Sequence, residues 1–167
     1  YSKNCRTIIN SAVITGTSGQ ANMGIYNHNG SINNTGNIHL GDSVIISPNE
    51  PEKNSYAIGI YADNSVLENH GNISVGADGI GIYSTNSPTA TKNYGDITST
   101  SDGAVGIFAD HADVENRGNI TLDGKKSIGI YGNKSSNIVN YGIIKKSKQR
   151  NTKYSRRLNR FYRYIIQ

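Results

Sequence analysis

Two aspartates offer the most specific chemistry in this sequence, because each follows a copy of the same short phrase. Asp63 follows Gly-Ile-Tyr-Ala and Asp110 follows Gly-Ile-Phe-Ala, with one related copy between them. If these copies stack as neighbouring strands about 4.8 Å apart, the two carboxyl groups lie about 9.6 Å apart. Inverting glycosidases hold their two carboxyl groups roughly 6.5–9.5 Å apart, so the pair is a candidate for polysaccharide hydrolysis. His111 and Asp113 cluster with Asp110 in the sequence.

The equivalent positions in the other copies do not extend an active site. None of them carries a Lys or Arg that could bind a uronate. Apart from one insertion, the copies also lack the long loops that would form a substrate cleft. We therefore interpret these positions as a column of solvated turn residues, which comprises His28, Asp63, Thr85, Asp110 and Asn133.

An aromatic residue lies just before this column in each copy. Strand alternation places it opposite the buried isoleucines, and therefore on the outside. A stacked aromatic stripe could bind sugars or a partner surface, or its rings could simply shield the backbone. The stripe comprises Tyr26, Tyr61, Tyr83, Phe108 and Tyr131.

These positions belong to a repeat of two sequence words. The first word, Gly-Ile-aromatic, recurs at intervals of 35, 22, 25 and 23 residues, and the second, Asn-x-Gly-x-Ile, begins 10 to 12 residues after each copy. A partial copy of the second word begins at Asn10. The longest interval contains a polar insertion at 42–55, which we expect to be a surface loop. The first word begins at Gly24, Gly59, Gly81, Gly106 and Gly129.

The apolar residues within each copy alternate with a period of two. Ile58 and Ile60 fall on one face of a strand, with Gly59 and Tyr61 on the other. Each copy therefore holds about three short strands separated by Gly, Asn and Asp turns, which predicts an all-β parallel β-helix (β-solenoid) over 1–144. We expect about five coils of roughly 23 residues plus a partial N-terminal coil. The strand before the second word is assigned to Ile32, Val66, Val114 and Ile138.

The first Asn of the second word predicts a structural ladder. Stacked copies place these asparagines above one another, where each side-chain amide can hydrogen-bond to the next. Asn also tolerates the left-handed backbone that a sharp turn requires. The predicted ladder comprises Asn34, Asn69, Asn93, Asn116 and Asn140.

Charge divides the chain into two parts. The net charge of +5 hides a body, 1–144, with twelve acidic and eight basic residues, and a tail, 145–167, with nine basic residues and no acid. The body therefore lacks the basic surface of a nucleic-acid-binding protein. The tail is interpreted as a disordered basic arm or as the product of a frameshift, and nucleic acid becomes a partner only if the tail is native.

The two words together resemble the repeats of autotransporter passenger domains, over about residues 8–144. That resemblance implies a single-stranded right-handed β-helix, secreted to the cell surface through a C-terminal outer-membrane β-barrel that this sequence does not contain. The chain also begins without Met or a charged-then-apolar leader, so we expect a fragment of a longer protein.

The function predicted from the sequence is that of an adhesin or structural stalk at the cell surface, without catalysis. Its expected partner is a host-cell or bacterial surface protein or glycan. A single cysteine, Cys5, excludes an internal disulfide. No calcium-binding nonapeptide, Walker or dinucleotide motif occurs, so we expect no cofactor or metal site. The alternatives are a fragment of a β-helical polysaccharide lyase or hydrolase, and a cytosolic binding module that uses the basic tail.

Overall fold

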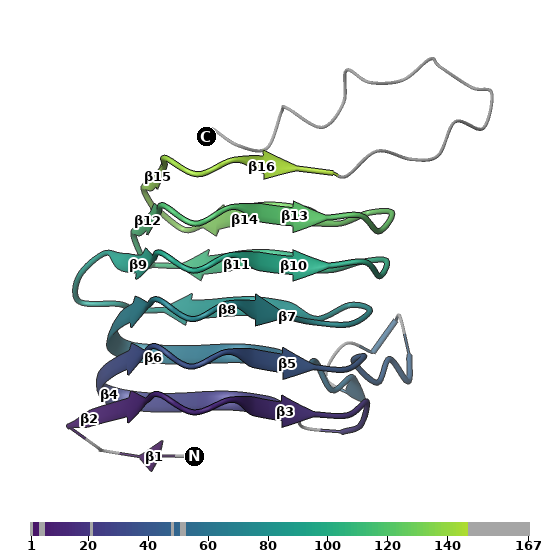
Figure 1. Cartoon of the computed structure of the whole chain (residues 1–167), viewed down its shortest axis with the longest axis horizontal. Helices are drawn as coiled ribbons and strands as arrows, with labels where there is room; N and C mark the ends of the chain where they lie inside the picture. The colour runs from purple at the N-terminus through teal and green to yellow at the C-terminus, as the bar shows by residue number, and fades with distance from the viewer. Residues whose placement is uncertain (1, 4–5, 21, 48, 51–52, 147–167) are drawn as a thin grey trace.

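The repeat words form short parallel strands, because β-branched isoleucine favours strands while Asn and Gly interrupt every run after a few residues. The computed structural model describes residues 2–3, 6–20, 22–47, 49–50 and 53–146. In this part of the chain the strands stack into a parallel β-solenoid of about six turns with about 24 residues per turn, which confirms the predicted fold (Figure 1).

One sheet of ten strands forms two of the three sides of each turn. In the first full turns the two sides are continuous in one long strand, β4 and then β6. In later turns they are separate strands, β8 and β9, β11 and β12, and β14 and β15. The bounds are β1 Ser2–Lys3, β2 Thr7–Asn10, β4 Met23–Asn34, β6 Ile58–Asn69, β8 Ile80–Thr85, β9 Thr91–Asn93, β11 Val105–Asp110, β12 Val114–Asn116, β14 Ile128–Asn133 and β15 Ile138–Asn140.

A sheet of six strands closes the third side. In Figure 1 its strands face the viewer and run to the right, while β8, β11 and β14 run to the left behind them as the chain ascends, which is a right-handed coil. The strands of this sheet are β3 Ile14–Gly16, β5 Ile38–Leu40, β7 Ile73–Ser74, β10 Ile97–Ser99, β13 Ile120–Leu122 and β16 Ile144–Lys145.

The core is a column of isoleucines between the two sheets. Ile60, Ile82 and Ile107 pair in register along the larger sheet, and all three are fully buried. Ile73 and Ile97 face them from the six-stranded sheet and are equally buried. Because each turn covers the one below it, the same burial repeats along the whole stack.

The strict alternation predicted around the first word is wrong in detail. Ile60 is buried, but Ile58 is only half-buried, and Gly59 between them is buried. A β-carbon at Gly59 would lie 2.7 Å from Cγ2 of Ile73. The glycine therefore occupies an interior position with no room for a side chain, and Ile58 before it is not part of the fully buried core.

The residues assigned to the strand before the second word all lie in strands, which confirms that assignment: Ile32 in β4, Val66 in β6, Val114 in β12 and Ile138 in β15. Ile32 is buried, but in β6 the interior position is Leu67, while Val66 is half-buried. The register explains the difference, because Ile32 pairs with Leu67 and Ser31 pairs with Val66.

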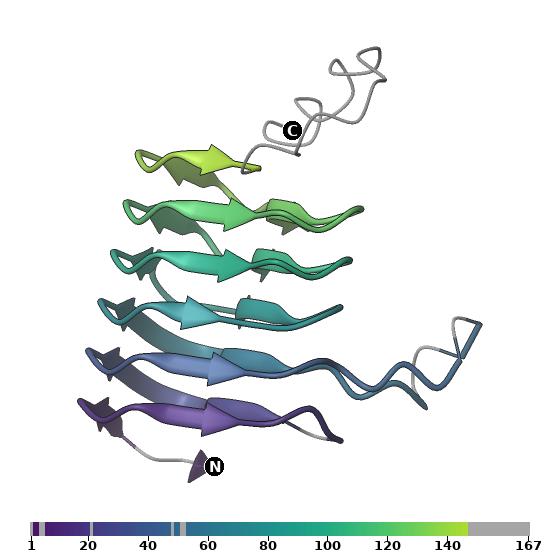
Figure 2. The same ribbon diagram turned by 45° about the vertical axis from the view of Figure 1, so that its right-hand side comes forward.

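The insertion at 42–55 projects from the stack between β5 and β6 (Figure 2). An antiparallel bridge between Val44 and Ser55 closes its base. Lys145, which the sequence assigns to the basic tail, instead lies in β16 and pairs with Thr121 of β13. Residues 147–167 of that tail lie outside the described residues. In the described part of the chain, no helix is long and apolar enough to span a bilayer.

Candidate functional site

The five aromatic side chains of the first word stand in one column on the outer face of β4, β6, β8, β11 and β14. Tyr83 and Phe108 stack with ring centroids 4.9 Å apart and planes 8° apart, and Phe108 stacks on Tyr131 at 5.0 Å. Tyr61 meets both Tyr26 and Tyr83 edge to face, at 5.2 and 4.7 Å. The rings are half-buried, so the stripe is continuous but still partly open to solvent.

The phenol groups of the stripe lie close to the neighbouring carboxylates. Burial, followed by the nearby Tyr83, Asp63 and Tyr26, raises the pKa of Tyr61 to about 12. Burial also raises the pKa of Tyr83, followed by Asp110, while Lys134 opposes the shift. The aromatic stripe and the aspartate column therefore form one surface, on which both tyrosines stay neutral near pH 7.

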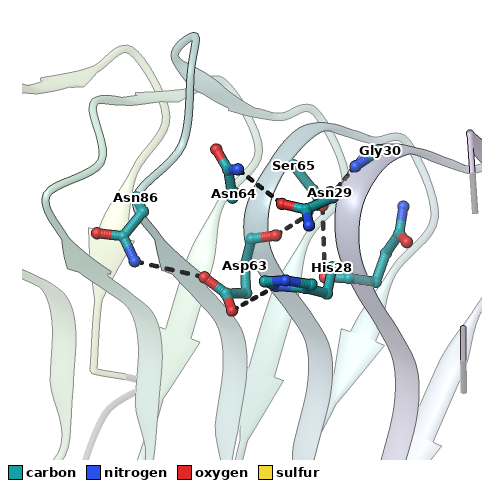
Figure 3. A network of polar contacts seen from close by, with 8 residues as sticks. His28, Asn29, Gly30, Asp63, Asn64, Ser65 and Asn86 are labelled. Carbon is teal, nitrogen blue, oxygen red and sulfur yellow. Dashed lines mark hydrogen bonds and ion pairs between the residues drawn. The ribbon is translucent and has the colours of Figure 1, made fainter. Parts of the chain in front are cut away.

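The predicted polar column is in register across five turns, from His28 through Asp63, Thr85 and Asp110 to Asn133. Nδ1 of His28 donates to Oδ2 of Asp63 at 2.8 Å, and Nδ2 of Asn86 donates to Oδ1 at 3.4 Å (Figure 3). Asp63 thus ties together the turns below and above it.

Asp110 has a different set of neighbours. Nζ of Lys134, from the next turn, donates to its Oδ2 at 3.2 Å. Nδ1 of His111 lies 3.1 Å from Oδ1, but without hydrogen-bond geometry. Lys134 is a cation that the column positions alone did not predict. Its signal is that it directly follows the column residue Asn133.

The turn after this column is left-handed in every copy. Asn29, Asn64 and Asn86 have φ of 60°, 46° and 51°, and the equivalent His111 and Lys134 have 51° and 47°. Asn and Asp adopt this conformation more readily than other residue types. Nδ2 of Asn64 donates to Oδ1 of Asn29 at 2.7 Å, and N of the adjacent Gly30 donates to Oγ of Ser65 at 3.2 Å (Figure 3). The left-handed residue thus follows each residue of the polar column directly, and the chain turns at the same place in every copy.

Two strand steps separate Asp63 from Asp110, with Thr85 between them, as the sequence predicts. Their side chains are only 23 % and 17 % exposed, and each is held by a cross-turn partner. Asp113 does not join this group, since its Oδ1 accepts a hydrogen bond from the backbone N of Asn137 at 2.8 Å.

The five asparagines of the second word lie directly above one another. Nδ2 of Asn34 donates to Oδ1 of Asn69, and the same 2.7 Å bond recurs from Asn69 to Asn93, Asn93 to Asn116 and Asn116 to Asn140. Asn10 extends the ladder by donating to Asn34 at 2.7 Å. Each Nδ2 also donates to the carbonyl of the residue two positions on, as from Asn93 to Gly95 at 2.8 Å.

A second ladder was missed in the sequence. Oδ1 of Asn37 accepts a hydrogen bond from the backbone N of Asn72 at 3.0 Å. In the same way, Oδ1 of Asn72 accepts from N of Asp96 at 2.9 Å, and Oδ1 of Asp96 accepts from N of Asn119 at 2.8 Å. Its signal was present, because the fourth position of the second word is Asn or Asp in four of its five copies. An amide or carboxylate oxygen there accepts a hydrogen bond from the turn above.

Metal ligands do not gather in the part of the chain that the structure describes, where no group of three or more His, Cys, Asp and Glu side chains could hold an ion. The surface therefore offers aromatic edges, amides, carboxylates and a few cations. Such groups can bind a ligand by hydrogen bonds and ring contacts.

Comparison with known proteins adds one finding. Residues 1–111 match the model of a family described as the BigA third pectate lyase-like domain. No curated protein and no solved structure matches the chain.

Proposed function

Because the chain belongs to the family of the BigA third pectate lyase-like domain, a β-solenoid, we propose that it is a rigid, non-catalytic adhesive module of a secreted bacterial surface protein. Its ligand in this proposal is a surface glycan. The resemblance of the two repeat words to autotransporter passenger domains supports a place at the cell surface. It also implies a C-terminal outer-membrane barrel as the partner needed for secretion.

One observation carries the proposal: the aromatic stripe and the aspartate column share one outer face. Sugars are bound by ring contacts to their C–H groups and by hydrogen bonds from their hydroxyls to carboxylates and amides. Tyr61, Asp63, Tyr83 and Asp110 supply both kinds of group on adjacent turns. The column is acidic at two of its five positions, so a neutral glycan suits it better than a polyuronate.

The absence of catalysis in this proposal is supported by how the two aspartates are engaged. His28 and Asn86 hold Asp63, and Lys134 holds Asp110. Both carboxylates are therefore already held by side chains from neighbouring turns, an arrangement that ties the stack together.

The test is to measure binding of the chain to neutral glycans and to polyuronates. A Tyr61→Ala/Tyr83→Ala variant should lose at least about fivefold in affinity, since two aromatic contacts contribute on the order of 1–3 kcal/mol. The control is Tyr56→Ala, which removes an exposed tyrosine outside the aromatic stripe. Equal glycan affinity of the double variant and this control would refute the glycan proposal.

The catalytic alternative keeps one specific observation in its favour, the two-turn spacing of Asp63 and Asp110. It requires polysaccharide turnover that disappears in Asp63→Asn or Asp110→Asn. The adhesive module instead binds without releasing products.

A further inference from the structure

A second outer surface lies on the side formed by β2, the C-terminal halves of β4 and β6, and β9, β12 and β15. Its first column is continuous through the paired residues of six turns. We call this column, together with the one beside it, the charged facet. The first column comprises Ile9, Asn33, Glu68, Lys92, Glu115 and Val139.

The neighbouring column of the facet contains the residues that directly follow the ladder asparagines. His70 and Tyr94 stack with ring centroids 4.6 Å apart and planes 9° apart. The guanidinium of Arg117 lies 4.6 Å from the ring centroid of Tyr141. Below them, Ser11 and Thr35 begin this column, directly after Asn10 and Asn34.

Ion pairs order the charges of the facet. Nζ of Lys92 lies 3.1 Å from Oε1 of Glu68, and Nε of Arg117 lies 2.6 Å from Oε1 of Glu115. The hydrogen bond from Lys92 to Glu68 raises the pKa of Lys92, so this cation stays charged at neutral pH. These side chains nevertheless remain open to solvent, with Lys92 40 % and Arg117 51 % exposed. Exposed Tyr and Arg side chains are the types that most often dominate protein interfaces.

The order of the first column makes the facet complementary to itself. Along the stack it is apolar, amide, acid, base, acid, apolar. A second copy turned antiparallel, about a two-fold axis between the turns of Glu68 and Lys92, places each of these two residues opposite the other. The same rotation sets Asn33 opposite Glu115.

The apolar ends also match in this arrangement. Ile9, 75 % exposed, lies opposite Val139, 46 % exposed. In the neighbouring column His70 faces Tyr94, and Thr35 faces Arg117. The antiparallel register therefore brings no two like charges into opposition, which is what a self-complementary two-fold interface requires.

We propose that the charged facet binds a second copy of this chain in an antiparallel, side-by-side pair. Six strands at about 4.8 Å span about 24 Å from first to last, so the interface is small and the association weak. Many copies displayed on one surface would raise the effective strength through multivalency. The facet lies on a different side from the aromatic stripe, so pairing leaves the proposed glycan surface open.

The test measures self-association of the full chain by sedimentation equilibrium over a range of concentrations. The wild-type chain should associate, and added salt should weaken the association because it screens the ion pairs. Lys92→Glu should reduce the association constant at least about tenfold, because the introduced carboxylate would then face Glu68 of the other copy. Glu68→Lys should do the same by setting two ammonium groups opposite each other. Lys125→Glu, which makes the same charge change outside the facet, is the matched control and should have no effect.

The decisive experiment mixes the two single variants. Lys92→Glu and Glu68→Lys chains should each fail to self-associate but should associate with one another, since their opposing charges are then complementary. Recovery in the mixture would also show that both variants are folded, because an unfolded chain has no facet to present. A wild-type chain that stays monomeric, or variants that show no recovery when mixed, would overturn the proposed pair.

Discussion

At the scale of single residues, the ladder asparagines each satisfy several buried hydrogen bonds at once. Asn93 accepts from Asn69 and donates to both Asn116 and the carbonyl of Gly95, and it is fully buried. No apolar side chain of similar size can replace these bonds. The residue type at this position is therefore set by the requirement that buried polar groups have partners.

Replacing Asn93 by Leu should destabilise the solenoid strongly. The substitution leaves polar atoms of Asn69, Asn116 and Gly95 buried without their present partner, at about 1–3 kcal/mol each. We expect a loss of about 3 kcal/mol or more, which lowers the Tm by roughly 10 °C. Thermal unfolding followed by circular dichroism measures it. Asn33→Leu, at an exposed position in β4, is the control and should change the Tm little. Equal Tm values for the Asn93 variant and the wild type would contradict the ladder.

Tyr61 should give the protein a dependence on alkaline pH. Its folded-state pKa is raised from 10.0 to about 12, mainly by burial. A raised pKa means that the neutral phenol stabilises the fold fully below pH 10, and that this contribution disappears as pH rises through about 12. Titration of phenolate absorbance should show a late step that is missing in Tyr61→Phe. A step of the same size in that variant would assign the shift to another tyrosine.

The residue-level predictions succeed where the physics is local to one repeat word. The ladder positions follow from Asn at a fixed place in each copy, because stacked copies repeat their hydrogen bonds. Which of Val66 and Leu67 faces the core was not predictable, because both are apolar and only the register of β4 with β6 decides between them. Lys134 was missed because its contact with Asp110 crosses from one turn to the next.

At the scale of elements, the glycine of the second word sets how closely two turns approach. A β-carbon at Gly95 would lie 2.0 Å from the carbonyl oxygen of Gly71 in the turn below. A β-carbon at Gly71, Gly118 or Gly142 would likewise lie 1.9 Å from a glycine carbonyl oxygen in the turn below. Backbone atoms cannot yield as a flexible side chain can, so this position requires glycine.

Gly95→Ala should therefore destabilise the protein by at least about 2 kcal/mol, since overpacking forces backbone shifts. The matched control is Gly19→Ala, because a β-carbon at Gly19 meets nothing within 4 Å. Urea unfolding of both variants measures the difference. A Gly95→Ala variant as stable as Gly19→Ala would show that the turns are further apart than described.

The insertion should be dispensable for folding. Val44 and Ser55 already bond to each other in both directions, at 2.8 and 2.9 Å, so a two-residue Asn-Gly turn can join them. Replacing 45–54 by Asn-Gly should leave the free energy of unfolding within about 1 kcal/mol of wild type. A variant that fails to fold would assign the insertion a role in the stack.

Element boundaries were harder to predict than element type. The period of two identified strands, but it could not show that two of them merge into the continuous β4 and β6. It also could not show that the first glycine of the first word occupies an interior position. That follows only from how close Ile73 of the opposite sheet lies to Gly59.

At the scale of the whole molecule, the outer surface is organised in columns that run along the solenoid. Each turn repeats the one below it, so equivalent positions of successive turns form a straight column of side chains along the solenoid. One side carries rings beside carboxylates, and another carries alternating charges. The number of turns and the aromatic and polar columns were predicted from the repeat, but the column of alternating charges was not. The partner of each column was not predictable, because binding depends on the ligand as well as on the surface.

In the proposed function, the aromatic and aspartate surface binds glycan without converting it. The most direct measurement incubates the chain with neutral glycans and with polygalacturonate, and records in the same samples the bound protein and any new reducing ends or unsaturated products. We predict binding to a neutral glycan and no product from any polysaccharide. Product formation that disappears in Asp63→Asn or Asp110→Asn would contradict the claim and identify the chain as an enzyme.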